Sequence, residues 1–158
     1  FGQINAAEML ACCHGDTDHY WRNVIRRQQF EQRFQAQLQA AGFDAVLMPA
    51  FGTPPYRHGQ AAELGVAGTY SSLWNVLGWP AGIVPVTRIR ADEAVGRATT
   101  RDRATHAAQL CERDASGLPV AVQLAAPPWQ ESRVLALMQA LEMRVRNEAA
   151  FPLTPMNP

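Results

Sequence analysis

The sequence predicts an α/β fold, and three observations lead to it. Segments with apolar residues every three to four positions alternate with short β-branched runs, which is typical of helices and strands within one unit. The 158 residues are 47% hydrophobic and 18% charged, a globular balance with enough chain for one core. No internal repeat and no dividing linker occur, so residues 1–158 are expected to form a single unit.

The first predicted element is a long helix over residues 17–41. Its apolar side chains recur at helical spacing with Arg, Gln and Glu between them. Asp16, Thr17 or Asp18 can cap its start. Gly42 can adopt the left-handed conformation that ends it.

A short buried strand is expected next, over residues 43–48 (FDAVLM), ended by Pro49. Residues 50–68 are rich in glycine and proline and predict a surface loop or a pocket wall without regular structure. Residues 69–77 (TYSSLWNVL) predict a helix that ends at Gly78.

The second half of the chain predicts two strands and two helices. Residues 81–89 are strand-like, although Pro85 must lie at a sheet edge or a bulge. A weak helix is expected from about residue 105 to 113. Residues 118–125 form an apolar run that predicts a strand inside the sheet. A last helix covers residues 131–147, and the tail, 149–158, is expected to be irregular.

Composition excludes several classes of function. The net charge is zero, so no overall field attracts nucleic acid or an anionic membrane. No apolar run reaches 18 residues, which predicts no transmembrane segment. Three cysteines, two of them adjacent, make no disulfide framework and suit a reducing cytoplasm. Because the chain begins at Phe1 and not at a methionine, we expect a piece or a trimmed product of something longer.

A polar cluster near the start is a candidate metal site. Thiolates and imidazoles are zinc ligands, but adjacent cysteines cannot easily both reach one tetrahedral ion. The pattern therefore favours a polar, helix-capping turn, and neither a metal site nor a cofactor is predicted. The cluster comprises Cys12, Cys13, His14, Asp16, Asp18 and His19.

Two residue pairs are candidates for nucleophilic catalysis. Ser71 and Ser72 lie on a predicted helix without a glycine-rich turn or a lysine base, so packing or pocket lining is the better interpretation. Cys111 follows His106 by five positions, a spacing that aligns side chains poorly on a helix, which favours a half-buried structural cysteine.

Trp129 follows two prolines where a buried strand turns into a helix. Ligands tend to bind at that edge of an open α/β sheet, and a stiff apolar ring there could line an acyl or aromatic pocket. A core tryptophan between strand and helix fits the residues equally well.

Four motifs follow one another along the chain: FDAVLMP (43–49), GTYSSLWNVLGWPAGIVPVT (68–87), SGLPVAVQL (116–124) and PWQES (128–132). This ordered set resembles the C-terminal third of amidase signature enzymes, most closely the fatty acid amide hydrolase branch and its bacterial relatives. The match runs from about residue 17 to 145.

This resemblance implies a three-layer fold with a mixed sheet and helices on both faces. It also implies hydrolysis of carboxylic amides through an acyl-enzyme, using a Ser–cis-Ser–Lys triad. The chain contains no lysine and no GGSSGG-type loop, and Ser71–Ser72 matches a helix of the family, so no catalytic residue is carried over. Gly68, Ser72 and Trp129 match positions that line the acyl channel.

The sequence therefore predicts the C-terminal segment of a cytoplasmic amidase, inactive by itself, with fatty acyl amides as a candidate substrate class. Its expected partners are a small-molecule amide substrate, the missing N-terminal part of the domain and, in the full enzyme, a second copy forming a homodimer. The alternative is a catalytically inactive, stand-alone binding or structural module.

Overall fold

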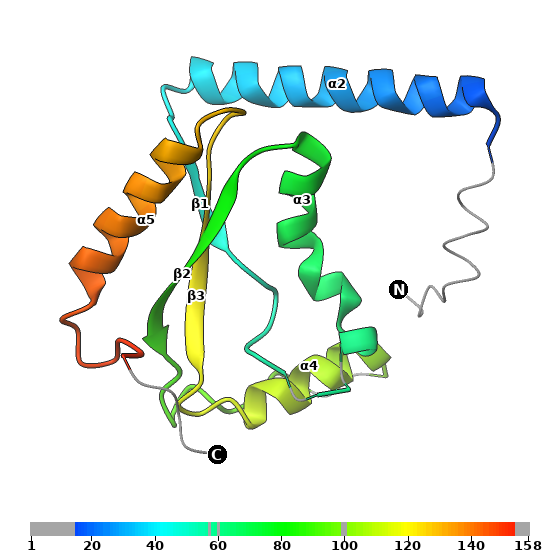
Figure 1. Ribbon diagram of the computed structural model, residues 1–158. Coiled ribbons are helices and arrows are strands. Elements are labelled where there is room, and N and C mark those ends of the chain that lie inside the picture. Colours follow the sequence, from blue (N-terminus) through cyan, green and yellow to red (C-terminus); the bar gives the residue numbers. More distant parts are fainter. Residues whose placement is uncertain (1–14, 57, 60, 99–100, 154–158) are drawn as a thin grey trace.

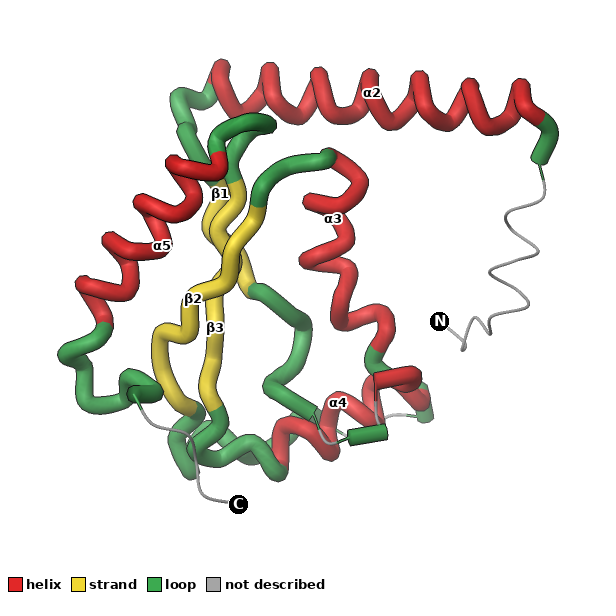
Figure 2. The backbone as a smooth tube through the Cα atoms, viewed as in Figure 1, coloured by secondary structure: helices red, strands yellow, loops and turns green. Residues whose placement is uncertain are grey.

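The computed structural model describes residues 15–56, 58–59, 61–98 and 101–153 (Figure 1). A small sheet lies between helices (Figure 2). The elements are α2 (Thr17–Ala40), β1 (Val46–Pro49), two short 3-10 helices (Ala61–Glu63 and Gly65–Gly68), α3 (Thr69–Leu77), β2 (Ala81–Arg88), α4 (Arg103–Arg113), β3 (Pro119–Ala125) and α5 (Glu131–Val145).

The three described strands form an antiparallel sheet in the order β1-β3-β2. β3 is central, as its continuous apolar run predicts. β2 is an edge strand, and its register with β3 is irregular between Pro85 and Thr87. Both features confirm the placement that proline requires, because a residue without an N–H cannot donate to a regular ladder.

Helices cover both faces of this sheet. Figure 1 shows α5 on one face and α3 on the other, with α2 lying across the top. Successive β3 side chains point to opposite faces, so Leu124 packs in the cluster beside α5 while Ala125 packs with Trp74 of α3. This arrangement fits an α/β fold.

Local signals set most element ends. The Asp16 carboxylate accepts a hydrogen bond from the His19 N–H at 2.7 Å, which caps α2, and Gly42 has a φ of 74° where that helix has ended. The strand expected from residue 43 begins only at Val46. The Phe43 N–H donates to the Leu38 carbonyl, so this residue still belongs to the turn that closes α2.

The N-terminal half of α2 extends beyond the sheet (Figure 1). The C-terminal half packs through Phe34 and Leu38, but Tyr20, Trp21 and Ile25 are 61%, 56% and 51% exposed. The apolar face that periodicity predicts is therefore covered over only half of its length. In the described part of the chain, no helix is long and apolar enough to cross a membrane.

Candidate pocket wall and neighbouring cavities

Two of the three predicted pocket residues lie at the start of the helix α3, Gly68 as its N-cap and Ser72 within it. Gly68 lies at its N-terminal end, and Ser72 is exposed one turn later, with its hydroxyl donating to the Gly68 carbonyl at 3.2 Å. The Ser71 hydroxyl donates to the Ala50 carbonyl at 3.0 Å. Each serine is thus bonded to a backbone acceptor, and neither bond involves a group that could remove its proton.

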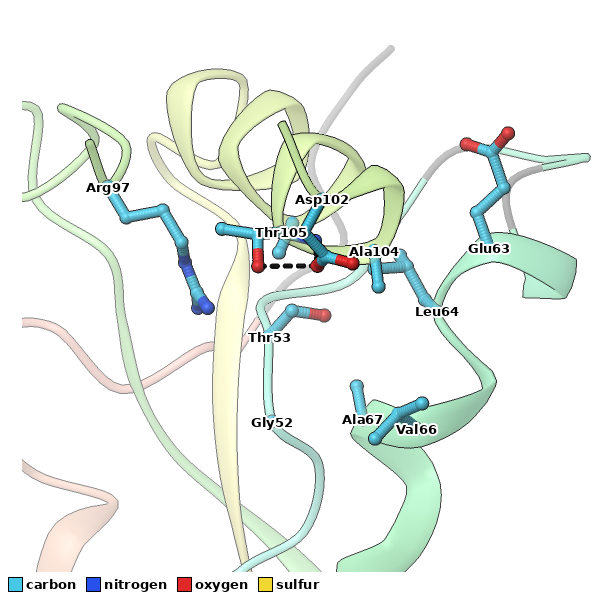
Figure 3. Close-up of a pocket in the computed structure, with 11 residues that line it drawn as sticks. Gly52, Thr53, Glu63, Leu64, Val66, Ala67, Arg97, Asp102, Ala104 and Thr105 are labelled. Carbon is cyan, nitrogen blue, oxygen red and sulfur yellow. Dashed lines mark hydrogen bonds between the residues drawn. The ribbon is translucent and has the colours of Figure 1, made fainter. Parts of the chain in front are cut away.

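A cavity of about 340 Å³ opens between the loop after β1, the short helices and the start of α4 (Figure 3). Its polar lining includes Thr53, Glu63, Arg97 and Asp102. A second cavity, of about 360 Å³, is lined mainly by prolines, Phe51 and Tyr56 and by the first residues of β3. Gly52 and Thr53 line both cavities, so the two are neighbours.

Hydrogen bonds lower the pKa of Asp102, which lines the first cavity, and of Glu112, which binds the cavity residue Arg97. The Asp102 carboxylate accepts hydrogen bonds from the Thr105 N–H and hydroxyl, both at 2.7 Å, and these bonds lower the pKa of Asp102 (Figure 3). Hydrogen bonds from the Arg97 side chain lower the pKa of Glu112, and the same pair raises the pKa of Arg97. Carboxylates with lowered pKa are poor general bases.

Among the residues that the structure describes, no serine, cysteine, histidine or lysine lines either cavity. The described cavities can hold a ligand, but the hydroxyl–carboxylate pair that they contain, Thr105 with Asp102, is the N-terminal cap of α4, and the lowered pKa of Asp102 makes it a poor base. Gly68, Ser72 and Trp129 do not line these two cavities either, although Val66 and Ala67, just before Gly68, line the first. Their role as an acyl pocket wall stays a prediction.

Trp129 lies in the turn between β3 and α5 and is 89% exposed. The interpretation as a core tryptophan is therefore wrong. Its φ of 65° places a bulky residue in the left-handed region, which is uncommon for a side chain of this size. Such strain occurs more often at functional positions than elsewhere.

The candidate pair Cys111 and His106 differs in exposure, with the cysteine buried and the histidine exposed. Cys111 is 4% exposed and packs against Leu64, Ala107 and Ala108, and this burial raises the pKa of its thiol. The neighbouring His106 is exposed. Cys111 is thus more deeply buried than expected, and the raised pKa opposes a reactive thiolate.

The N-terminal polar cluster lies partly outside the described residues, because Cys12, Cys13 and His14 are not among them. Asp16, which is described, caps α2. Among the residues that the structure describes, no group of three or more His, Cys, Asp or Glu side chains could hold a metal ion.

Sequence reasoning missed one buried polar contact. The Trp74 indole N–H donates to the Gln123 side-chain oxygen at 3.0 Å, with both residues buried. A glutamine inside the otherwise apolar run PVAVQLA was the available signal, since a buried amide requires a partner.

Comparison with known proteins gives consistent matches. Residues 3–135 match the family described as Amidase. Fatty acid amide hydrolase 1 of Caenorhabditis elegans is 29% identical over 119 residues, covering 73% of this chain and 21% of that protein. The putative amidase C550.07 of Schizosaccharomyces pombe is 30% identical over 131 residues, covering 80% of this chain and 24% of that protein.

Fatty-acid amide hydrolase 1 of Sus scrofa is 34% identical over 126 residues, covering 77% of this chain and 22% of that protein. The chain thus spans between 21% and 24% of the length of these three relatives.

Proposed function

Because this chain belongs to the amidase family, we propose that it is the C-terminal, substrate-binding segment of a cytoplasmic amide hydrolase. The substrates are carboxylic amides, with fatty acyl amides as the candidate class that two of the relatives suggest. The reaction proceeds through an acyl-enzyme on a Ser–cis-Ser–Lys triad located outside residues 1–158.

The absence of lysine from this sequence is the main observation that supports a catalytic triad outside residues 1–158. A serine hydroxyl of ordinary pKa needs a base within hydrogen-bond reach, and the triad's base is a neutral lysine. None of the 158 residues is lysine, and Ser71 and Ser72 both donate to backbone carbonyls. The nucleophile therefore belongs to another part of the enzyme, and this segment supplies the wall formed by Gly68, Ser72 and Trp129.

The exposed apolar surface supports a partner in the same domain. Ile83 of the edge strand β2 is 51% exposed, and the N-terminal half of α2 leaves its apolar face uncovered. Edge strands invite further pairing. Additional strands from the rest of the amidase would extend this antiparallel sheet to the mixed sheet of the three-layer fold, and the complete enzyme could then pair as a homodimer.

The missing triad equally favours a second candidate, a catalytically inactive binding or structural module derived from an amidase. The DNA upstream of the Phe1 codon distinguishes the two. An open reading frame that encodes a lysine and a serine–glycine loop supports the enzyme segment, and a start codon immediately before Phe1 supports the module.

Hydrolysis of p-nitroanilides tests the proposal directly. We expect turnover by the longer protein that contains this segment and none by residues 1–158 alone. The Ser72→Ala variant of the isolated segment should match its parent. Turnover by the isolated segment that Ser72→Ala abolishes would overturn the proposal, and a longer protein without turnover would favour the inactive module.

A further inference from the structure

We propose that Gln123 is a positioning residue, which sets where α3 lies on the sheet and thereby where the wall formed by Gly68 and Ser72 lies. The inference rests on the proposed function, because it concerns the same pocket. It assigns a role to a side chain on β3 that lines neither described cavity.

In the described part of the chain, three directional bonds attach α3 to three different segments. The Ser71 hydroxyl donates to the Ala50 carbonyl in the loop after β1, at 3.0 Å. Arg27 of α2 donates to the Val76 carbonyl at 3.2 Å. The Trp74 indole donates to Gln123 of the central strand at 3.0 Å. Of these three, the Trp74–Gln123 bond alone is buried and joins α3 to the sheet itself.

Gln123 has apolar neighbours in the sheet, so its bond to Trp74 determines where α3 lies. In the sheet register Gln123 lies opposite Met48 of β1 and Ile83 of β2, so it is the polar member of an apolar row. Apolar packing and ring stacking tolerate small sliding movements, whereas a hydrogen bond requires a particular distance and angle. A buried amide without a partner is costly, so α3 is held where the indole N–H meets it.

The pocket residues lie on the opposite side of α3 from this anchor. Gly68, Ser72 and Val76 follow one another at four-residue steps and form one stripe. Ser72 is two residues from Trp74, which places it about 200° around the helix at 3.6 residues per turn. A shift or roll of α3 at Trp74 therefore moves Ser72 directly, although Gln123 itself does not touch the pocket wall.

The chain offers a matched control in Gln109 of α4. The two glutamines are both buried, at 3% exposure for Gln109 and 5% for Gln123. The Gln109 side chain donates to the Arg97 carbonyl at 2.7 Å, so this bond fastens the loop before α4 and not α3. Replacing each glutamine by methionine keeps side-chain length and removes one buried amide, so the loss of a buried polar group is common to both variants.

The test measures kcat/KM of the longer amidase for acetyl, octanoyl and dodecanoyl p-nitroanilides. In Gln123→Met we expect the ratio of long-chain to acetyl hydrolysis to change by about tenfold, because a displaced wall alters acyl contacts. The acetyl rate should change little, since the reacting groups are untouched. Gln109→Met should keep the wild-type ratio even if its melting temperature falls.

A second variant keeps the test decisive if Gln123→Met does not fold. Trp74→Phe/Gln123→Met removes both partners and leaves no buried polar group of this pair without its partner, so it should fold and show the same changed ratio. The proposal is overturned if folded Gln123→Met, or the folded double variant, retains the wild-type ratio. A wild-type enzyme that hydrolyses none of the three anilides would instead overturn the proposed function.

Discussion

Trp74 and Trp79 are stacked with ring centroids 5.9 Å apart, but their indole N–H groups differ. Trp74 donates to Gln123, whereas the buried Trp79 N–H has no hydrogen-bond partner among the described residues. A buried donor without an acceptor costs free energy, and removing it recovers that cost.

The two tryptophans should therefore respond differently to the same change. Trp74→Phe leaves the Gln123 oxygen unpaired, while Trp79→Phe removes an unpaired donor. Because both lose the same ring volume, the cavity contributions are similar, and Trp74→Phe should be the more destabilising by about 1–3 kcal/mol. Urea unfolding at neutral pH measures this difference. Equal losses would contradict the importance of the Trp74–Gln123 bond.

At the scale of single residues, the sequence predicted local backbone roles, such as caps and turns, better than it predicted burial and long-range contacts. The cap at Asp16 and the left-handed glycines follow from local chemistry. The exposure of Trp129 does not, because burial depends on what packs against a position, and two prolines before it fix only the backbone. Arg97 and Glu112, 15 residues apart, meet only after the chain has folded.

Gly78 connects α3 to the following strand and is the clearest test at the scale of elements. Its φ is 68°, and a side-chain carbon added there would have an Arg27 guanidinium nitrogen as its nearest neighbour, at 4.0 Å. The cost of Gly78→Ala thus comes from the backbone alone and should be about 1–2 kcal/mol.

Gly65→Ala is the control for that substitution. Gly65 lies in a 3-10 turn, its φ is not positive, and apart from its chain neighbours no atom of the described residues lies within 4 Å of the added carbon. Thermal unfolding should show a clear loss for Gly78→Ala and none for Gly65→Ala. Equal stabilities would show that the left-handed turn is not needed to end α3.

The contact between Arg97 and Glu112 fastens the loop before α4 to that helix. Three hydrogen bonds from Arg97, including one from its backbone N–H at 2.7 Å, reach the Glu112 carboxylate. They lower its pKa below the ordinary 4.5. A lowered folded-state pKa contributes stability above the ordinary value, and this contribution is lost as pH falls through the folded-state pKa.

The Glu112→Gln variant should accordingly be less stable than its parent at neutral pH. On acidification its free energy of unfolding should fall by less than that of the parent, because it has no carboxylate at this position to protonate. Urea midpoints measured at pH 7 and at pH values below the ordinary pKa of 4.5 for Glu112 provide the comparison. Parallel pH profiles for the variant and its parent would contradict the contribution of this pair.

The α-helices and strands were predicted because each follows from a short pattern, but the two 3-10 helices, Ala61–Glu63 and Gly65–Gly68, lie in the stretch 50–68 that was wrongly expected to have no regular structure. Periodicity and caps located α2, α3 and α5 closely, and Pro85 marked the edge strand. The start of β1 was predicted three residues too early, because the Phe43 N–H donates a hydrogen bond to the Leu38 carbonyl and hydrophobicity does not indicate such a bond.

For the whole molecule, periodicity identifies which face of a helix is apolar but not what covers it. The two ends of α2 show this. Ile25 is 51% exposed, whereas Leu38 is buried in the cluster with Trp74 and Leu77. The uncovered half is where we place the remainder of the amidase.

Two charged substitutions in the isolated segment test this asymmetry. Ile25→Glu should leave the free energy of unfolding nearly unchanged and reduce self-association, because it adds a charge to an exposed apolar face. Leu38→Glu should cost about 3 kcal/mol, since it buries a carboxylate without a partner. Sedimentation and urea unfolding measure the two effects, and a strong loss of stability in Ile25→Glu would show that this half of α2 is already packed.

The location of the nucleophile is the central claim, and covalent labelling measures it most directly. A fluorophosphonate probe reacts with activated serines, so peptide mapping of the labelled longer amidase identifies the nucleophile. We expect one labelled serine outside residues 1–158 and no label on Ser71 or Ser72, either there or in the isolated segment. Label on Ser71 or Ser72 would contradict a nucleophile outside this segment.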